Sequence, residues 1–423
     1  MDTTTLESLL QEAAAAAEAR NYWAAIEGYT QLLSRTSPES GDAEVHRIRL
    51  AALSRRGELL RQLGENEAAL AGFNQYYLEA GSSSDAVEAL VSIGAQHSQM
   101  GNYSKAMEAL HEGQHLAQAL NLTPGRAKTL YHIGLTNYRL GRIDDALSNL
   151  YKALALFQQL EDRFYLMRTW NTIGISHHQA GEIDKAIHAY KIAVEYARYY
   201  SPNHMATVLS NLGESHQDLF DMTQAVAYHR EALRLVEPLN LESTEGDLRR
   251  NLGVDLCALG ELGEGVALLY QALRISRSTG NPEIEMQSLY SVALAELDRG
   301  HDNVALEHIK ELTALAENSK ARVYLSQANY ALGLYHKKQG NYAAAEEAWH
   351  QSLFQAHETA QRLLLWRIHA GLGDIAASQA LADVHRRIAS EVIQQIAEPI
   401  EDEAVRAVFL NSAPIQAVLN PNA

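Results

Sequence analysis

The chain has 423 residues, of which 47% are hydrophobic and 21% charged, and its formal net charge is −17. This composition is typical of a soluble folded protein. The acidic balance argues against direct nucleic-acid binding, because phosphate repels such a surface. A single cysteine, Cys257, excludes an internal disulfide framework and predicts a reducing, cytoplasmic location. The first 20 residues lack the basic cluster of a secretory signal, and no uncharged apolar run approaches ~18 residues, so no membrane insertion is expected.

Residues 1–35 are predicted to form a helix pair. One of the threonines at 3–5 can cap the first helix, and the segment 20–22 forms the turn. Apolar residues then recur at helical spacing along the second helix, namely Trp23, Ile26, Tyr29 and Leu33. Residues 37–41 are a loop by composition.

From residue 57 onward the chain repeats at steps of 37 to 40 residues. Each unit begins with a glycine or, once, an alanine, in the series Gly57, Gly94, Gly134, Gly174, Gly213, Gly253, Ala293 and Gly333, with Gly373 as a degenerate member. A second glycine follows seven residues later as Gly64, Gly101, Gly141, Gly181, Gly260, Gly300 and Gly340, and Phe220 takes this place once. Five residues further on comes a small residue, which is alanine in every unit except that of Gly265.

This pattern predicts one helix hairpin per repeat. The first glycine lies inside the first helix, helix A, where it costs about 1 kcal/mol relative to alanine. Such a cost is tolerated where the second helix, helix B, crosses too closely for a larger side chain, and the small residue on helix B is the matching contact. The second glycine ends helix A with a left-handed cap. A large apolar residue before each first glycine fills the core, and the residues two after the turn, from Tyr103 to Tyr342, start the core face of helix B.

The spacing resembles the tetratricopeptide repeat, whose consensus places Leu-Gly, a downstream aromatic residue and then Ala at these offsets. The resemblance covers residues 1–360. The 40-residue unit is similar to those of Pins/LGN adaptors, kinesin light chain and MalT-like sensor domains, and Asn211-Leu-Gly-Glu-Ser-His216 and Asn251-Leu-Gly253 are most like the Pins/LGN version. The resemblance implies an all-α, right-handed superhelix of about nine stacked antiparallel helix pairs, with helix A lining the concave side.

Residues 361–423 depart from the repeat and are predicted to be a degenerate repeat followed by a C-terminal helical cap. Residues 380–397 are predicted as a helix that stops before Pro399, and residues 401–410 as a short last helix. A solenoid needs such a cap to cover its last open face. Trp366 and the leucines before it would offer a homodimer surface if nothing covered them.

The sequence gives no pattern typical of an enzyme. Four histidines, His97, His177, His216 and His336, occupy the aromatic position of the repeat, which favours packing over metal binding. His111 and His115 share a helix face but have no third ligand. No phosphate-binding loop and no Gly-x-Ser-x-Gly elbow occur, so we expect no catalytic residue, no metal and no cofactor. Cys257 is expected to be a small buried hydrophobe.

The family geometry implies that a partner protein or peptide binds in the concave groove. The predicted groove residues are polar or aromatic and were expected to be locally basic: Lys128, Tyr131, Tyr138, Arg139, Arg168, Asn171, His178, Gln179, Ser210, Glu214, Gln217 and Arg250. Asn, Gln and Arg can bond a peptide main chain, and Tyr provides rigid contact area.

Three functions are compatible with this sequence. The first is a non-catalytic scaffold or adaptor that binds a peptide or helix. The second is a regulatory sensor module of a bacterial signalling or transcription system, which the tail after residue 361 favours through its resemblance to the tails of STAND and MalT-like sensors. The third, much less favoured, is a metal-dependent hydrolase that uses the histidines. The identity of the partner does not follow from the sequence.

Overall fold

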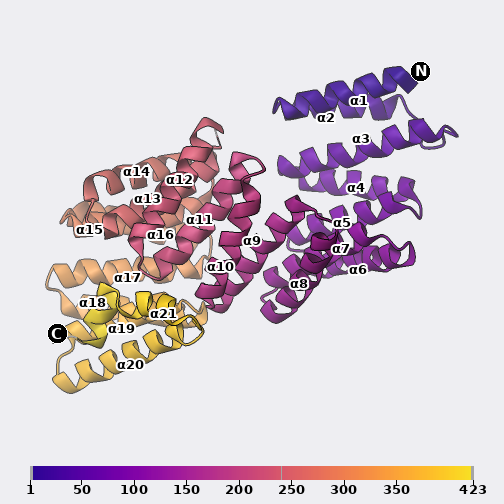
Figure 1. The fold of residues 1–423 in the computed structure, drawn as a ribbon. Coiled ribbons are helices and arrows are strands. Elements are labelled where there is room, and N and C mark those ends of the chain that lie inside the picture. Colours follow the sequence, from indigo (N-terminus) through magenta and orange to yellow (C-terminus); the bar gives the residue numbers. More distant parts are fainter. Residues whose placement is uncertain (1–2, 240, 421–423) are drawn as a thin grey trace. The chain divides into compact units, whose positions relative to one another are not determined.

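The computed structural model describes residues 3–239 and 241–420, and these residues form 22 α-helices, one short 3-10 helix and no strand. Within each of the two units described below, consecutive helices form antiparallel pairs that pack on their neighbours in the sequence (Figure 1). No helix in this described part is long and apolar enough to span a membrane. The predicted fold class, an all-α array of stacked helix pairs, is confirmed.

The chain divides into two compact units, residues 1–176 and 177–423, and the division falls inside α9. The first unit contains α1 Thr3–Glu18, α2 Tyr22–Ser34, α3 Ala43–Gln62, α4 Asn66–Ala80, α5 Ser84–Gln99, α6 Tyr103–Ala119, α7 Thr123–Arg139, α8 Ile143–Gln159 and most of α9 Arg163–Ala180. The second contains α10 Ile183–Ala197, α11 Pro202–Asp218, α12 Met222–Val236, α13 Glu242–Ala258, α14 Leu262–Thr279, α15 Pro282–Asp298, α16 Asp302–Asn318, α17 Arg322–Lys338, α18 Tyr342–Glu358, α19 Arg362–Ile375, α20 Gln379–Ala397, α21 Glu403–Leu410 and α22 Ala413–Leu419. The predicted boundary near residue 360 lies inside the second unit and stays a prediction.

The first glycine of each repeat lies where helix B crosses helix A too closely for a side chain. A Cβ atom at Gly134 would lie 2.7 Å from Cγ of Leu150, and one at Gly253 would lie 2.9 Å from the carbonyl oxygen of Gly265. At Gly333 it would collide with the indole of Trp349. The predicted close crossing is confirmed, and the same contact repeats from pair to pair.

The second glycine of each repeat has the predicted left-handed backbone. The φ values at Gly64, Gly101, Gly141, Gly181, Gly260, Gly300 and Gly340 lie between 71° and 86°. Phe220 occupies the same turn with φ of 59°, a conformation that costs a residue with a Cβ atom about 1–2 kcal/mol. Contacts of the Phe220 ring described below offset part of this cost.

The core lies between the two helices of each pair and between neighbouring pairs. The apolar residues before the first glycines are buried at Ile93, Ile133, Ile173, Leu212 and Leu252, as predicted. On helix B, a large side chain packs against the first glycine in six repeats, in the series Phe73, Leu110, Leu150, His229, Leu269 and Trp349. The residues two after the turn start helix B as predicted, but Tyr342 is 55% exposed and does not belong to the core.

Two pairs of ionisable side chains are buried in this core. In the first unit the Arg49 guanidinium binds both carboxylate oxygens of Glu79, at 2.6 and 2.8 Å, and also donates to the carbonyl oxygens of Leu33 and Thr36. In the second unit His229 Nδ1 lies 2.6 Å from Asp255 Oδ2, and both side chains are fully buried. Each side chain therefore has the close partner that a buried ionisable group requires.

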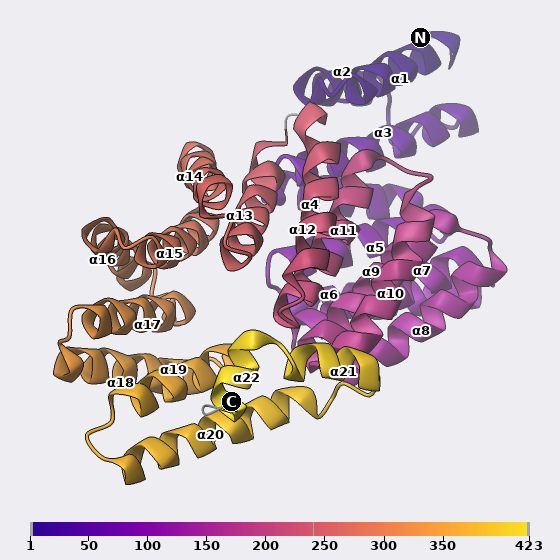
Figure 2. The same cartoon turned by 60° about the vertical axis from the view of Figure 1, so that its left-hand side comes forward.

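The C-terminal segment ends in two short helices, where the sequence predicted one. The predicted helix at 401–410 is α21, and α22 follows it after a turn at Ser412. The second helix was missed because Pro414 was not recognised as a first-turn proline, a position where proline favours helix. Figure 2 shows α21 and α22 returning from α20 toward α10. Trp366 is covered inside the second unit, at 4% exposure, so the proposed dimer surface at this residue has no basis.

Candidate functional site

A polar groove runs across four successive repeats of the second unit. Its residues come from α9, α11, α13 and α15, with Asn281 at the N-cap of α15, so helix A of each repeat lines it as predicted. The cavity has a volume of about 680 Å³, which is in the range of ligand-binding sites. Because the helices advance one repeat at a time, equivalent positions on each helix face the same hollow.

Five of the predicted groove residues meet there: His178, Ser210, Glu214, Gln217 and Arg250. They lie on three different helices and are brought together only by the stacking of the repeats. Gln179 lines a neighbouring cavity of about 810 Å³, also in the second unit.

Hydrogen bonds hold the groove side chains in place. Asn251 Nδ2 donates to Glu214 Oε1 at 3.0 Å, and Gln217 Nε2 donates to Asp255 Oδ1 at 2.7 Å. Asp255 is itself held by the buried His229. Gln217 therefore connects the groove surface to the ionisable pair in the core, and its amide is oriented before any ligand arrives.

The groove in the second unit is acidic, which corrects the expectation of a locally basic surface. Four carboxylates line it, against two side chains that can be cationic: Glu214, Asp218, Asp247 and Glu283, with His178 and Arg250. Burial disfavours the charged imidazole of His178, but Asp218 at 3.0 Å outweighs this and raises the pKa. Burial also raises the pKa of Asp247, which Arg250 opposes. Arg250 Nε is buried and has no hydrogen-bond partner among the described residues.

Apart from Arg250, the Lys and Arg residues of the prediction lie in the first unit. Lys128 forms an ion pair with Glu88 at 2.7 Å, and Arg139 Nη1 donates to Ser98 Oγ at 3.1 Å. The Arg168 guanidinium lies over the rings of Tyr131, Phe164 and Tyr165, at 5.2 to 5.6 Å from their centroids. Arg168 is thus held rigidly between aromatic rings, as expected for a cation–π contact.

The aromatic residues of the prediction differ in accessibility. Tyr131 is 3% exposed and its hydroxyl lies 3.3 Å from that of Thr172, so its side chain is part of the core rather than the surface. Tyr138 and Asn171 are half-buried. In the first unit, Arg139 and Tyr138 therefore remain accessible, whereas Tyr131 does not.

The sequence reasoning missed several groove residues. Asn211 and Asn251 lie two residues before the first glycine of their repeats and line the groove, as do Thr207, Thr244 and Gln287. The signal was present, because Asn211 and Asn251 occur at the same position of adjacent repeats. The prediction named Ser210 and Arg250, three residues before these glycines, and passed over the asparagine that follows each of them.

Two histidines at the aromatic position of the repeat each pair with one carboxylate. His177 Nδ1 lies 2.6 Å from Glu182, and His216 Nδ1 lies 3.1 Å from Asp221. His111 and His115 are both exposed. Within the described residues, no three His, Cys, Asp or Glu side chains gather as a metal site would require. Cys257 is half-buried rather than buried, and loss of solvent raises the pKa of its thiol to about 11.

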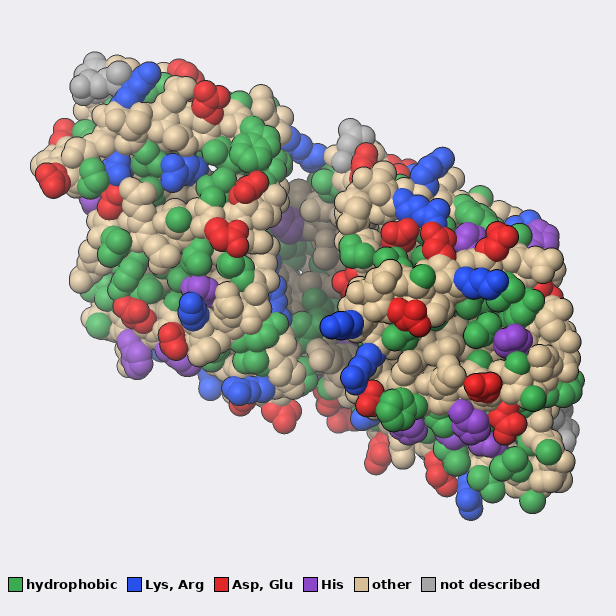
Figure 3. All heavy atoms as spheres, turned by 180° about the vertical axis from the view of Figure 1, so that it is seen from behind, with side chains coloured by type: hydrophobic (Ala, Val, Ile, Leu, Met, Phe, Trp, Pro, Cys, Tyr) green, Lys and Arg blue, Asp and Glu red, His purple; other side chains and the backbone are tan. Residues whose placement is uncertain are grey.

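The acidic and basic side chains outside the groove are mixed. Figure 3 shows them interspersed with small hydrophobic groups over the face drawn there.

Residues 125–198 and 165–238 each match the family model of the tetratricopeptide repeat. The helix pairs around them have the glycines, the turns and the close helix crossing that this repeat predicts. The chain contains tetratricopeptide repeats, which the family model matches over residues 125–238. No curated protein matches its sequence.

Several solved structures share the fold of this chain. The apo form of RapI has a TM-score of 0.65 at 13% identity, covering 82% of this chain and 98% of RapI. A Rap protein complexed with competence and sporulation factor has a TM-score of 0.63 at 14% identity, covering 83% and 99%. The apo quorum sensor NprR from B. thuringiensis has a TM-score of 0.61 at 14% identity, covering 83% and 99%. At these identities the likeness establishes the fold.

Proposed function

We propose that the protein is a non-catalytic peptide-binding regulator whose ligand lies in the acidic groove of the second unit. The observation that carries this proposal is the convergence of polar side chains from four successive A helices on one cavity. A peptide main chain presents a donor and an acceptor at each residue, and amide side chains such as Asn211, Asn251 and Gln287 match both. A groove that crosses repeats suits an extended ligand.

The charge of the groove predicts the charge of the peptide. With four carboxylates against one arginine and one histidine, a ligand that carries Lys or Arg gains electrostatic attraction. Arg250, whose Nε lacks a partner in the described part of the chain, is positioned to donate to a carbonyl of the same ligand. We therefore favour a cationic peptide with a main-chain contact at Arg250.

The regulatory part of the proposal is supported by fold likeness to RapI and NprR and by the bound factor in the Rap complex. Solenoid repeats contact only their neighbours, so a ligand that bridges several repeats can change their curvature. The tail after residue 361 stays a prediction of a sensor-type module. The accessible basic residues of the first unit, Lys128 and Arg139, are proposed as a second contact region for partners.

To test the proposal, peptides that bind the full chain are selected from a random displayed library. Fluorescence anisotropy then measures the affinity of each selected peptide. We expect enrichment of Lys and Arg, and binding at least ten-fold weaker in the variants Asp247→Asn/Glu283→Gln and Arg250→Ala. The control is Arg274→Gln, an exposed residue of α14 outside the groove. Selected peptides that are acidic, or that bind the groove variants as tightly as the control, would refute the proposal. Arg139→Glu tests the second contact region proposed in the first unit. Arg139 is exposed, so its replacement does not disturb the aromatic rings around Arg168.

A further inference from the structure

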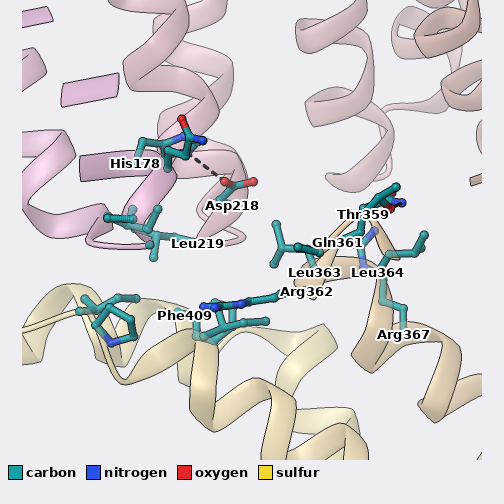
Figure 4. Close-up of a pocket in the computed structure, with 18 of the residues that line it drawn as sticks. His178, Asp218, Leu219, Thr359, Gln361, Arg362, Leu363, Leu364, Arg367 and Phe409 are labelled. Atoms are coloured by element: carbon teal, nitrogen blue, oxygen red, sulfur yellow. Dashed lines mark hydrogen bonds and ion pairs between the residues drawn. The ribbon is translucent and has the colours of Figure 1, made fainter. Parts of the chain in front are cut away.

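Two adjoining cavities lie below the polar groove in the second unit, with volumes of about 810 and 790 Å³. Both are lined by Tyr290, Gln327, Leu363 and Arg367, so these four residues lie where the cavities meet. Apolar side chains form much of the remaining wall, including Leu219, Leu294 and Phe409. Figure 4 shows that the first cavity is surrounded by three segments: the ends of α9 and α11, the α18–α19 connection, and the C-terminal segment.

Arg367 brings an uncompensated positive charge into this space. Its guanidinium lies over the rings of Phe220 and Trp366, at 5.5 and 5.4 Å from their centroids. Among the described residues, no carboxylate lies within ion-pair distance of it. Aromatic stacking fixes the plane of the guanidinium and leaves its edge, which carries the donors, available for a bidentate contact.

Two further polar atoms near Arg367 lack partners. Gln327 Oε1 and Trp366 Nε1 are each buried with no hydrogen bond in the described structure. Buried polar atoms in native proteins are nearly always bonded. Gln327 lines both cavities, so its unbonded oxygen indicates a missing hydrogen-bond donor there, whereas Trp366 lines neither cavity. Tyr290 adds a hydroxyl at the same junction, and the positive charge of Arg367 acts on it, although burial dominates and raises its pKa.

The C-terminal segment closes one side of these cavities. Asp184 Oδ2 accepts hydrogen bonds from the backbone N–H groups of Glu401 and Asp402, at 3.1 and 2.9 Å. Lys185 forms an ion pair with Glu401 at 3.0 Å. These contacts fix the segment to the start of α10.

Phe220 adds an aromatic contact to this closure. Its ring stacks on that of Phe409, with centroids 6.2 Å apart, and meets Trp366 edge-on. The repeat that has a strained phenylalanine in place of its turn glycine is therefore one whose turn contacts the segment. The strained backbone at Phe220 places an aromatic ring in the wall of the second cavity, and a glycine has no side chain that could do so.

We propose that these cavities form a second ligand site, which binds a carboxylate with an apolar body at Arg367 beneath the C-terminal segment. The carboxylate bonds the Arg367 guanidinium, and the apolar part lies against Leu363, Tyr290 and Phe409. Three carboxylates lie on the cavity walls, and none of them occupies this role. Asp221 lies 3.1 Å from His216 Nδ1. Asp218 is paired with His178, and the positive charge that acts on Asp298 is that of Lys338. This site does not depend on the peptide-binding function proposed above.

Isothermal titration calorimetry on the full chain tests the site with three probes: octanoate, a short acetylated apolar peptide with a free C-terminus, and octanamide. We expect saturable binding of at least one carboxylate and at least ten-fold weaker binding of octanamide. Octanoate binding alone identifies a small organic acid as the ligand class, and peptide-acid binding alone identifies a peptide terminus. No saturable binding of either carboxylate up to millimolar concentration, or equal binding of octanamide, would overturn the proposal.

Variants connect the binding to Arg367. Arg367→Gln should weaken the carboxylate at least ten-fold, and Arg367→Lys should retain part of the affinity because it keeps the charge. The matched control is Arg387→Gln on α20, an exposed residue whose ion pair with Glu391 lies outside these cavities. If Arg367→Gln does not fold, the comparison of octanoate with octanamide on the unmodified protein still decides the question. Unchanged binding in a folded Arg367→Gln variant would contradict the assignment.

Discussion

Two glycines of one helix pair provide a direct test of the packing rule on which this fold depends. Gly253 lies inside α13, where an added Cβ would come within 2.9 Å of both the carbonyl oxygen of Gly265 and the side chain of Leu269. Gly263 lies in the first turn of α14, where an added Cβ would meet nothing within 4 Å. The substitution Gly→Ala is chemically identical at the two positions, so only the surroundings differ.

The expected effects have opposite signs. Alanine gains up to about 1 kcal/mol over glycine in a helix, and Gly263→Ala should keep most of this gain. At Gly253 the same gain is outweighed, because real Cβ atoms do not approach a backbone oxygen at 2.9 Å and the helices must separate. Overpacking of this kind costs about 1–3 kcal/mol, and here it acts on α13, one of the helices that line the groove, and on its partner α14. We expect Gly253→Ala to be less stable than the unmodified protein by about 1–2 kcal/mol.

Urea unfolding followed by circular dichroism measures this difference. The free energies of unfolding should order as Gly263→Ala, unmodified chain, Gly253→Ala, with similar dependence on urea. If Gly253→Ala proved as stable as Gly263→Ala, the close crossing of helices A and B would not be the reason for the first glycine of the repeat.

Three further predictions use the same measurements. Arg49→Met should cost about 3–5 kcal/mol, because it leaves the Glu79 carboxylate without its cationic partner, and Arg49→Met/Glu79→Leu should recover much of the loss in a double-mutant cycle. Burial and the neighbouring His385 lower the pKa of His369 to about 4 from 6.5. Between pH 6.5 and 4 only the unfolded chain takes up this proton, so stability should fall by roughly 3 kcal/mol on acidification; His369→Leu should flatten this slope, and an equally steep slope would count against the assignment. Phe409→Ala, at a side chain 1% exposed, should cost about 3–5 kcal/mol and increase hydrogen exchange in residues 399–419; unchanged exchange there would show that the ring does not hold the segment.

The sequence determined the fold because the repeat is a local signal. A glycine at the helix crossing, a glycine at the turn and an alanine on helix B recur at fixed offsets, and each reports a contact within about 30 residues. Helix periodicity and turn chemistry act over the same short distance, so helices as far apart as α2 and α20 were predicted with nearly correct bounds. The position of Gln217 and Arg250 in a groove followed from the same register.

The tertiary structure alone decided which groove residues are accessible and what charge the groove has. Tyr131 and Gln217 occupy equivalent-looking helix surfaces in the sequence, yet one is buried and the other lines a cavity. The closure of the second unit by the C-terminal segment joins Asp184 to residues more than 200 positions away, and no local pattern encodes such a contact. The contact of Phe220 could not be predicted from the sequence either. The repeat register shows only that Phe220 replaces a turn glycine, whereas the folded chain shows that its ring stacks on that of Phe409. Local periodicity fixes the repeat unit, whereas burial and long-range contacts arise only when the units are stacked.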